Sequence, residues 1–239
     1  MPLEKIDDNI WLAEGGIVSF YGLPYPTRSV IIRLPGGGLW VWSPVALTDA
    51  LRQAVDALGP VAHLVSPNPI HHLYLSEWQR AFPDAALWGP PGTIAKRRDL
   101  AFTATLGDTP PPAWAGVIDQ WHLQIGRRFS EVVFLHRPSG TAILTDTSEA
   151  FDHDFLHRHW SRWQRGIARL LGITEDPGRA PLDLRLLSLP RRAPLRSRVQ
   201  QLIDSAPRRV VMAHGTWQRT DGAAWLARSF SWLGVTPPG

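Results

Sequence analysis

Short apolar runs separated by glycine and proline fill the first 45 residues, and this pattern predicts β-strands joined by turns. The pair Gly15-Gly16 indicates a turn between the first two runs, and Pro35-Gly-Gly-Gly38 indicates the loop of a hairpin. The expected strands cover residues 9–12, 17–21, 29–33 and 39–42.

Apolar residues at helical spacing follow this β-rich region and then alternate with further apolar runs. Thr48 and Gly59 bracket the first expected helix, in which Leu51, Val55 and Leu58 share one face. Further helices are expected at residues 73–82, 151–171, around 195–203 and 221–233. Further strands are expected at residues 62–65, 86–88, 119–124, 130–136, 141–145, 182–188 and 209–213.

A loop rich in proline, glycine and alanine at residues 106–116 separates two stretches that have the same order of elements. The two halves cover about residues 1–105 and 117–239, and each is β-rich before helices and strands alternate. A sheet that carries helices on one face buries its other face against a second layer. We therefore expect residues 1–239 to form one domain of the α/β class, a four-layer αββα sandwich.

The expected helix at residues 151–171 is amphipathic and basic. Its apolar face is formed by Leu156, Trp160, Trp163, Ile167, Leu170 and Leu171, and its opposite face by Arg158, Arg162, Arg165 and Arg169. The apolar face of an ordinary surface helix packs on the core. Alternatively, the helix is a flap over a site or a contact for a membrane surface or a partner, since basic amphipathic helices with tryptophan bind at interfaces.

The composition of the chain limits the kinds of site that it can form and the cell compartment in which it is expected. The 239 residues contain no cysteine, which excludes disulfides, thiolate ligands and a cysteine nucleophile. The net charge of +4 comes almost entirely from arginine, because Lys5 and Lys96 are the only lysines, and it gives no specific signal for nucleic acid. The N-terminal segment has no signal-peptide core and no apolar run approaches the roughly 20 residues of a membrane span, so a cytoplasmic protein is expected.

Four residues with metal-binding side chains follow predicted strands: His71, His72, Asp146 and His214. In open α/β sheets, sites gather at the C-terminal ends of strands. Imidazole and carboxylate groups suit a divalent cation, and zinc takes such ligands in a roughly tetrahedral shell. His71 and His72 are adjacent, so both reach one ion only if their loop is tight. Otherwise one of them ligates and the other caps the next helix.

Several segments resemble the metallo-β-lactamase superfamily, and they occur in the same order along the chain. Leu64-Val-Ser-Pro-Asn-Pro-Ile-His-His72 resembles the strand and loop that carry the signature Thr-His-x-His-x-Asp-His. Gly36-Gly-Gly-Leu-Trp-Val-Trp42 is similar to the N-terminal strand pair of that family. Thr141-Ala-Ile-Leu-Thr-Asp146 is similar to the strand that delivers a bridging aspartate, and Val210-Val-Met-Ala-His-Gly215 to the strand of the last histidine. The Pro-Asn-Pro-x-His-His loop is more closely similar to a divergent, uncharacterised subfamily, a domain of unknown function.

The resemblance implies one metal site where the family has two. The first two signature histidines fall on Pro67 and Pro69, whose side chains cannot ligate, whereas His71 stands at the signature aspartate and His72 at the third histidine. All four candidate ligands then belong to the retained site. We expect it to hold one divalent metal, zinc before iron or manganese.

Two further departures from the family pattern affect the site. The middle histidine of the family falls near Arg127 and Arg128, whose guanidinium groups could bind a substrate carboxylate or phosphate, although a solvated hairpin turn is an equal alternative. The early strand ends in Ser43-Pro44 and lacks the usual Asp-x-Gly.

Two functions from different classes are consistent with these residues. The first is a mononuclear metal-dependent hydrolase that acts on a small molecule of unknown identity, with metal-activated water as the nucleophile. Four protein ligands would nearly close a tetrahedral shell, which argues for a weakly active or structural site. The alternative is a non-catalytic member of the fold, with or without metal, which binds a ligand or a partner. Fold alone does not decide between them.

Overall fold

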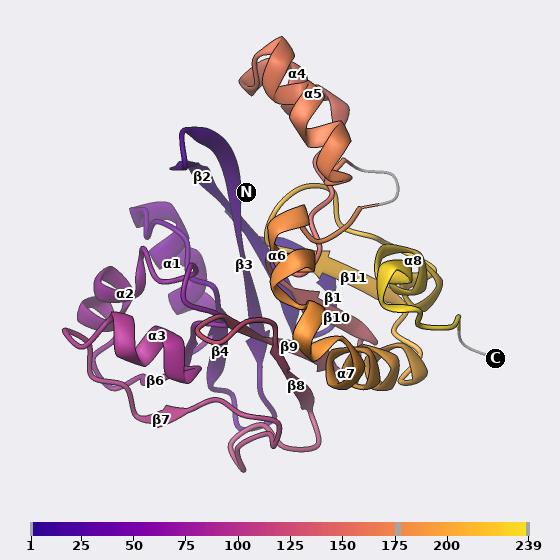
Figure 1. Cartoon of the computed structure of the whole chain (residues 1–239). Coiled ribbons are helices and arrows are strands. Elements are labelled where there is room, and N and C mark those ends of the chain that lie inside the picture. The colour runs from indigo at the N-terminus through magenta and orange to yellow at the C-terminus, as the bar shows by residue number, and fades with distance from the viewer. Residues whose placement is uncertain (1, 175–177, 238–239) are drawn as a thin grey trace.

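Two β-sheets form the centre of the molecule in a computed structural model that describes residues 2–174 and 178–237 (Figure 1). The seven-stranded sheet has the order β1-β2-β3-β4-β5-β6-β7, and the four-stranded sheet has the order β11-β10-β9-β8. The strands of the first sheet are β1 (Glu4–Asp7), β2 (Ile10–Phe20), β3 (Leu23–Arg33), β4 (Leu39–Trp42), β5 (Val61–Val65), β6 (Ala86–Gly89) and β7 (Ala104–Thr105). Those of the second are β8 (Ile118–Gln124), β9 (Ser130–His136), β10 (Thr141–Leu144) and β11 (Arg209–Met212).

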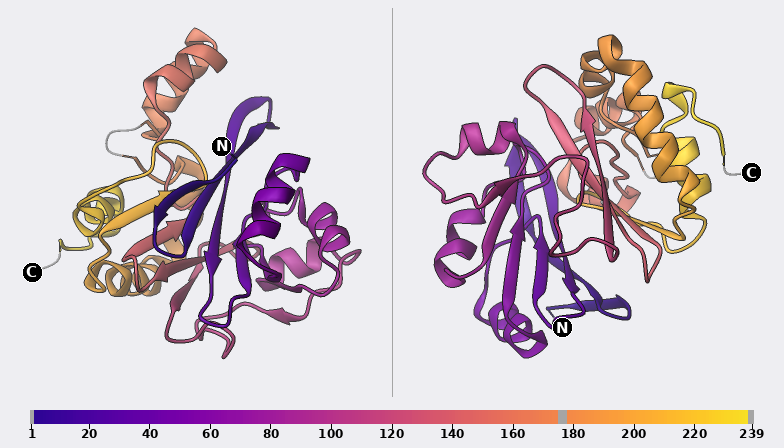
Figure 2. Two further views of the ribbon diagram at one scale, coloured as in Figure 1. Left: turned by 180° about the vertical axis from the view of Figure 1, so that it is seen from behind. Right: turned by 90° about the horizontal axis from the view of Figure 1, so that it is seen from below.

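Helices cover the outer face of each sheet, as two further views show (Figure 2). The helices are α1 (Asp49–Leu58), α2 (Leu75–Ala81), α3 (Pro91–Lys96), α4 (His153–His159), α5 (Arg162–Leu171), α6 (Leu182–Leu187), α7 (Arg192–Asp204) and α8 (Gly222–Ser229), with short 3-10 turns at Leu189–Arg191 and Ser231–Leu233. Helices α1, α2 and α3 lie on the seven-stranded sheet, and α7 and α8 lie on the four-stranded sheet (Figure 1). The predicted αββα sandwich is confirmed.

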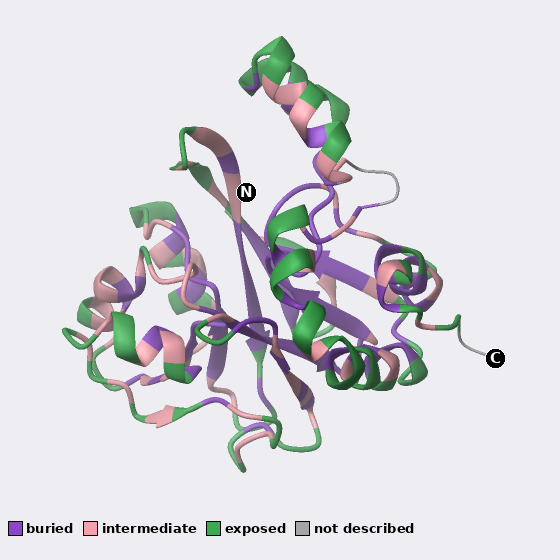
Figure 3. Ribbon diagram, in the orientation of Figure 1, coloured by how far each residue is buried: buried purple, intermediate pink, exposed green. Residues whose placement is uncertain are grey.

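The alternation of side chains along the strands explains this layering. Trp40 and Phe134 meet between the sheets, with ring centroids 5.1 Å apart at 74°. The intervening residues of β4 and β10, such as Val41 and Leu144, point outward, where they pack with α1 and α2 or with α7 and α8. Both faces of the central strands are therefore buried, and exposure is confined mostly to the helices, the loops and the outer parts of β1, β2 and β7 (Figure 3).

The expected turn at Gly15-Gly16 is wrong, because β2 runs through it without interruption. The register of β2 on β3 shifts between Glu14 and Ile17, so the glycines occupy a bulge. A Cβ on Gly15 would come 2.7 Å from Cγ1 of Val45, so the close approach there requires glycine. The chain reverses further on, at Tyr21 and Gly22. A pair of glycines is compatible with either geometry, and strand pairing decides between them.

The expected single helix at residues 151–171 is two helices separated by an extended Trp160. The Trp160 indole donates to the carbonyl of Pro24 at 2.8 Å, which holds this residue against β3. Ser161 then begins α5 with a capping box, in which its backbone N–H donates to Gln164 Oε1 at 2.8 Å. Local capping and one buried tryptophan therefore override a continuous helical pattern.

The expected strand at residues 182–188 is also wrong, because these residues form α6. The run Leu-Asp-Leu-Arg-Leu-Leu has no β-branched residue, and leucine and arginine are good helix formers. Leu184 is its buried side chain, and Arg185 donates to the carbonyl of Leu171 at 2.8 Å. Within the described residues, no helix has both the length and the apolar character needed to cross a bilayer.

Candidate metal centre

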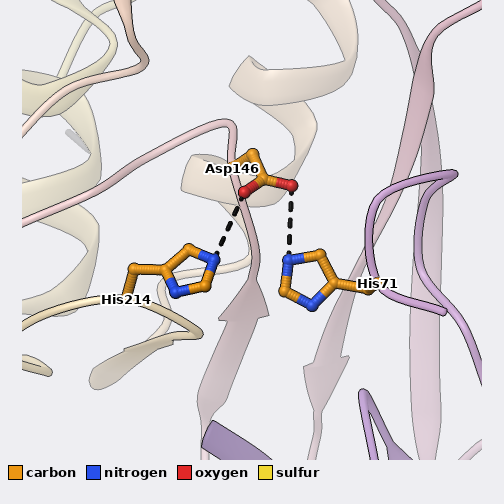
Figure 4. Close-up of side chains that lie close together, drawn as sticks. All are labelled: His71, Asp146 and His214. Atoms are coloured by element: carbon orange, nitrogen blue, oxygen red, sulfur yellow. Dashed lines mark ion pairs between the residues drawn. The ribbon is translucent and has the colours of Figure 1, made fainter. Parts of the chain in front are cut away.

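Three of the predicted residues come together, one carried by the seven-stranded sheet and two by the four-stranded sheet (Figure 4). His71 lies in the loop after β5, Asp146 follows β10, and His214 follows β11. Nε2 of His71 lies 3.3 Å from Oδ2 of Asp146, and Nε2 of His214 lies 3.4 Å from Oδ1. One ligand atom from each residue lies within 4.8 Å of the other two.

A buried carboxylate on β9 shapes the turn that presents Asp146. Glu131 accepts hydrogen bonds from the backbone N–H groups of Thr145, Asp146 and Thr147 at 2.7, 3.0 and 3.1 Å, and from the Thr147 hydroxyl at 2.7 Å. Burial and the charge of Asp146 raise the pKa of Glu131, and these donors oppose the shift. Glu131 is not among the predicted site residues, since nothing local in the sequence distinguishes it from an ordinary strand residue.

Asn68 links the two loops that carry His71 and Asp146. Its amide Nδ2 donates to Oδ2 of Asp146 at 2.6 Å and to the Thr145 hydroxyl at 2.8 Å. Its Oδ1 accepts from the backbone N–H groups of Ile70 and His71 at 2.8 and 3.1 Å. Asn68 is fully buried, so this one side chain fixes the spacing of two candidate ligands. In the sequence, the position of this asparagine between two prolines is the feature that could have pointed to its role.

Each histidine is oriented through its Nδ1 atom. Nδ1 of His71 lies 2.7 Å from Oγ of Ser43, the residue that replaces the usual family ending of the early strand. Nδ1 of His214 lies 2.7 Å from the carbonyl oxygen of Pro26. Because a carbonyl only accepts, this nitrogen of His214 carries the hydrogen, and its Nε2 presents a lone pair when the ring is neutral. Hydrogen bonds of this kind orient imidazole ligands in metal sites.

The backbone around His214 is held by a buried arginine. Nη1 of Arg28 donates to the carbonyl oxygens of Met212 and Gly215 at 2.6 and 2.9 Å, one on each side of the histidine. Nε of Arg28 also donates to Glu14 at 2.6 Å, which balances its charge. The ring edge of His214 meets Tyr25, with centroids 5.0 Å apart. His214 is thus fixed in position by neighbours from β2, β3 and β11.

The electrostatics of the cluster favour a cation. Burial alone would raise the pKa of Asp146, but the neighbouring imidazole groups of His71 and His214 lower it below its usual range. Nε2 of His71 is buried and makes no hydrogen bond. In a tetrahedral shell with bonds of about 2.0–2.1 Å, ligand atoms lie about 3.3–3.4 Å apart, and each imidazole Nε2 lies at such a distance from a different oxygen of the Asp146 carboxylate. With one ligand atom of each residue within 4.8 Å of the other two, His71, Asp146 and His214 could hold one divalent cation.

His72 does not join this group, although it was expected to. Its N–H donates to the carbonyl of Ile70 at 2.9 Å in a tight turn, and its ring turns toward Arg97, with Nδ1 3.3 Å from Nη1. Burial and the nearby charges of Lys96 and Arg97 lower the pKa of His72 to about 4. Adjacent side chains in such a turn point in different directions, so the set of four candidates reduces to three.

A cavity of about 490 Å³ opens beside the three residues. Its walls are largely apolar and aromatic, and Lys96 adds a positive charge. The apolar part includes Val18, Phe20, Tyr25, Ile70, Leu73 and Phe129. Arg127 and Arg128, the expected substrate-binding residues, are exposed and do not line the cavity. Their hairpin does border it, but through Phe129, because Gly126 and Phe129 close the turn and leave the arginines at its tip.

The two prolines at the lost ligand positions lie in the same loop. The carbonyl of Pro67 accepts from the N–H of Val132 at 2.9 Å, which ties the loop to β9, and Pro69 lines the cavity. Within residues 2–174 and 178–237, the groups of three or more potential ligands reduce to the single cluster described above. The expectation of one metal per chain stays a prediction.

Comparisons with known proteins agree with this geometry. Residues 7–155, more than half of the chain, match the family model described as domain of unknown function DUF4336. The chain belongs to this family. No curated protein matches the sequence. The match runs from the last residue of β1 to the start of α4, and so includes His71 and Asp146.

Solved structures similar to this member of the DUF4336 family are metallo-β-lactamases. DIM-1 metallo-β-lactamase exposed to ceftazidime aligns with a TM-score of 0.64 and 13% identity, over 97% of this chain and 95% of its own. A metallo-β-lactamase from Erythrobacter litoralis with β-mercaptoethanol in the active site gives 0.63 and 12%, over 97% and 95%. One from Pontibacter korlensis gives 0.62 and 13%, over 98% and 99%. At this identity the likeness establishes the fold, of which the chain is a divergent member.

Proposed function

We propose that the chain is a mononuclear metal-dependent hydrolase of a small molecule, with His71, Asp146 and His214 as the protein ligands. The observation that carries the proposal is a three-ligand set beside a cavity of about 490 Å³. Catalytic zinc sites have three protein ligands and keep one position open, whereas structural sites have four. The exclusion of His72 from the cluster therefore favours catalysis over a closed structural site.

The metal, when bound, would supply Lewis-acid activation of water or of a substrate oxygen. The chain's own residues provide the geometry. Ser43 and the carbonyl of Pro26 keep both Nε2 atoms facing Asp146. Asn68 and Glu131 fix the position of the carboxylate. The apolar cavity walls limit water and leave room for a small substrate, since ligand pockets commonly span about 300–1,000 Å³.

Zinc is the proposed metal. Two imidazoles and one carboxylate match known catalytic zinc sets, and the same set with open positions also occurs with iron. The substrate would be a small ester, lactone, amide or phosphoester, because activated water attacks all of these. The charged residues Asp146 and Lys96 line the cavity, and neither of them selects one of these substrate classes over the others. A panel of substrates is therefore needed to choose among the classes.

Elemental analysis of the purified chain tests the metal first. We expect about one divalent ion per chain, lost in His71→Ala and in His214→Ala. His72→Ala is the matched control, because this histidine neighbours the cluster but lies outside it. Equal metal in all three variants would contradict the ligand assignment.

A panel of hydrolase substrates tests the activity. Chelated protein is supplied separately with zinc, manganese and iron, and we expect activity that returns with metal and is absent in His214→Ala. A folded chain that binds one metal but hydrolyses nothing would support the non-catalytic alternative. Activity that survives both EDTA and His214→Ala would exclude the proposed site.

A further inference from the structure

Helices α4 and α5 form an arm that projects from the body of the molecule (Figures 1 and 2). Leu156 and Trp160 anchor the arm by packing with Tyr25 and Phe151. Two large apolar side chains of α5 are left uncovered, since Trp163 is 67% exposed and Leu170 is 81% exposed. Both were expected on the buried face, so this exposure is a feature of the structure that the helical pattern alone did not indicate.

The exposed face of α5 combines apolar and basic side chains. At about 100° per residue, Leu170 lies about 20° from Trp163 around the helix axis, and Arg162 and Arg169 lie about 100° and 120° away in the same direction. All four residues are exposed. Gly166 falls between the two pairs and leaves the backbone open, because nothing lies within 4 Å of a Cβ built there. The result is a paired stripe, apolar on one side and cationic on the other.

The arm is strongly cationic. The helices of the arm, residues 153–171, contain four arginines and three histidines but a single acidic residue, Asp154. Arg165 and Arg169 of α5 also line a shallow cleft of about 170 Å³ together with His153 and His157 of α4. The rings of these two histidines lie 4.0 Å apart at their centroids. Such a concentration of positive charge favours the binding of an anionic partner.

The β2–β3 hairpin extends the same end of the molecule (Figures 1 and 2). Ile17 and Tyr21 near its tip are 48% and 92% exposed. Val18 and Phe20, which alternate with them, pack against the cluster that anchors the arm and also line the cavity beside the metal centre. A surface that received the arm and the hairpin tip together would therefore lie next to the cavity.

We propose that the arm docks the protein on an anionic phospholipid surface. Trp163 and Leu170 enter the interfacial region, and Arg162 and Arg169 bind lipid phosphates, as in basic amphipathic helices that lie in the plane of a membrane. Charge complementarity selects this occupant. A second copy of the chain would oppose arginine to arginine, and a purely apolar partner would leave the guanidinium groups unmatched. The proposal is independent of the metal and of hydrolysis.

Co-sedimentation of the full chain with lipid vesicles tests the proposal. We expect binding to vesicles of phosphatidylcholine with phosphatidylglycerol, binding at least about tenfold weaker to phosphatidylcholine alone, and release by added salt. The double variants Trp163→Gln with Leu170→Gln, and Arg162→Gln with Arg169→Gln, should each weaken binding to the anionic vesicles by about tenfold or more. All four side chains are exposed, so circular dichroism should show intact folding.

Matched controls use equally exposed residues elsewhere on the surface. Leu186→Gln with Leu187→Gln changes leucines of α6 that are 56% and 53% exposed, and Arg196→Gln with Arg228→Gln changes exposed arginines of α7 and α8. Both controls should bind vesicles like the unaltered chain. The proposal is overturned if the folded chain ignores anionic vesicles, if it binds both lipids equally, or if only the controls weaken binding. A dimer in light scattering that Trp163→Gln with Leu170→Gln dissociates, without vesicle binding, would assign the face to a second copy instead.

Discussion

Asn68 donates a 2.6 Å hydrogen bond to Asp146, and this bond joins a loop of the seven-stranded sheet to a candidate ligand of the four-stranded sheet. The backbone N–H of His71, the candidate ligand of that loop, donates to the same asparagine at 3.1 Å. The separation of the two candidate ligands is therefore set by a side chain outside the candidate set. Hydrogen bonds of this kind commonly contribute 10–100-fold, roughly, to metal affinity.

Asn68→Leu should weaken metal binding by about 10–100-fold, because Asp146 would lose its donor and gain freedom to rotate. It should also lower the free energy of unfolding by about 2–3 kcal/mol, since buried groups lose their partners. Chelator competition and urea unfolding measure the two effects. Gln120→Leu is the control, because this buried amide donates to the carbonyls of Gly107 and Thr109 away from the site. Equal loss of metal affinity in both variants would contradict the role of Asn68.

Glu131→Gln should destabilise the fold by about 3 kcal/mol. Each carboxylate oxygen of Glu131 accepts at least two hydrogen bonds, so an amide would turn its own N–H groups toward N–H donors. Glu149→Gln is the contrasting variant. Burial and the charges of Asp146 and Asp183 raise the pKa of Glu149 well above its usual range, which favours the protonated form, so an amide should cost less than about 1 kcal/mol. Similar losses in urea unfolding would refute the difference.

The stability of the protein should fall as the pH falls from about 6.5 to about 4, and His136 should be one cause. Burial lowers the pKa of His136 to about 4, although Asp7 opposes this. In the unfolded chain its pKa is about 6.5, so the unfolded state binds the proton first. His136→Asn, which can keep the contact with Ser139, should remove about 2 kcal/mol of this pH dependence. Urea unfolding of the unaltered chain and of His136→Asn across this range measures the difference, and equal slopes would contradict the role of His136.

Truncation to alanine should lower the free energy of unfolding strongly at Trp160 and hardly at all at Trp163. Trp160 is 2% exposed and packs between Tyr25 and Phe151, so Trp160→Ala should lower the free energy of unfolding by about 3–5 kcal/mol. Trp163→Ala should change it by less than about 0.5 kcal/mol, because the side chain is 67% exposed. Thermal unfolding of the two variants gives the comparison. A large loss at Trp163 would mean that α5 packs on its tryptophan face after all.

The three candidate ligands were visible in the sequence because each follows a strand whose apolar pattern is unmistakable. Val210 to Ala213 are buried on both sides of the strand, and His214 is the first polar residue after them. The residues that orient the ligands were not visible in the same way. Glu131 acts on a turn 14 to 16 positions further along the chain, a distance that only the register of β9 and β10 determines.

The misread elements have a common physical cause, which is that local pattern leaves two geometries of similar energy. Glycines at positions 15 and 16 allow a turn or a bulge, and the long pairing of β2 with β3 selects the bulge. Apolar residues at helical spacing from position 163 to position 171 indicate a buried face, but the arm has no layer above Trp163 and Leu170 to bury them. Tertiary contacts decide such cases, and they lie far away in sequence.

The seam between the sheets gives the candidate centre a further property. His71 is carried by the sheet built from residues 4–105, and Asp146 and His214 by the sheet built from residues 118–212. An ion held by all three would add a cross-link between segments that side-chain packing, hydrogen bonds and one connecting loop already join. Neither segment alone contains all three candidate ligands. Metal loading should therefore report on correct assembly of the whole chain, and polypeptides truncated within the 106–116 loop should be unable to retain it.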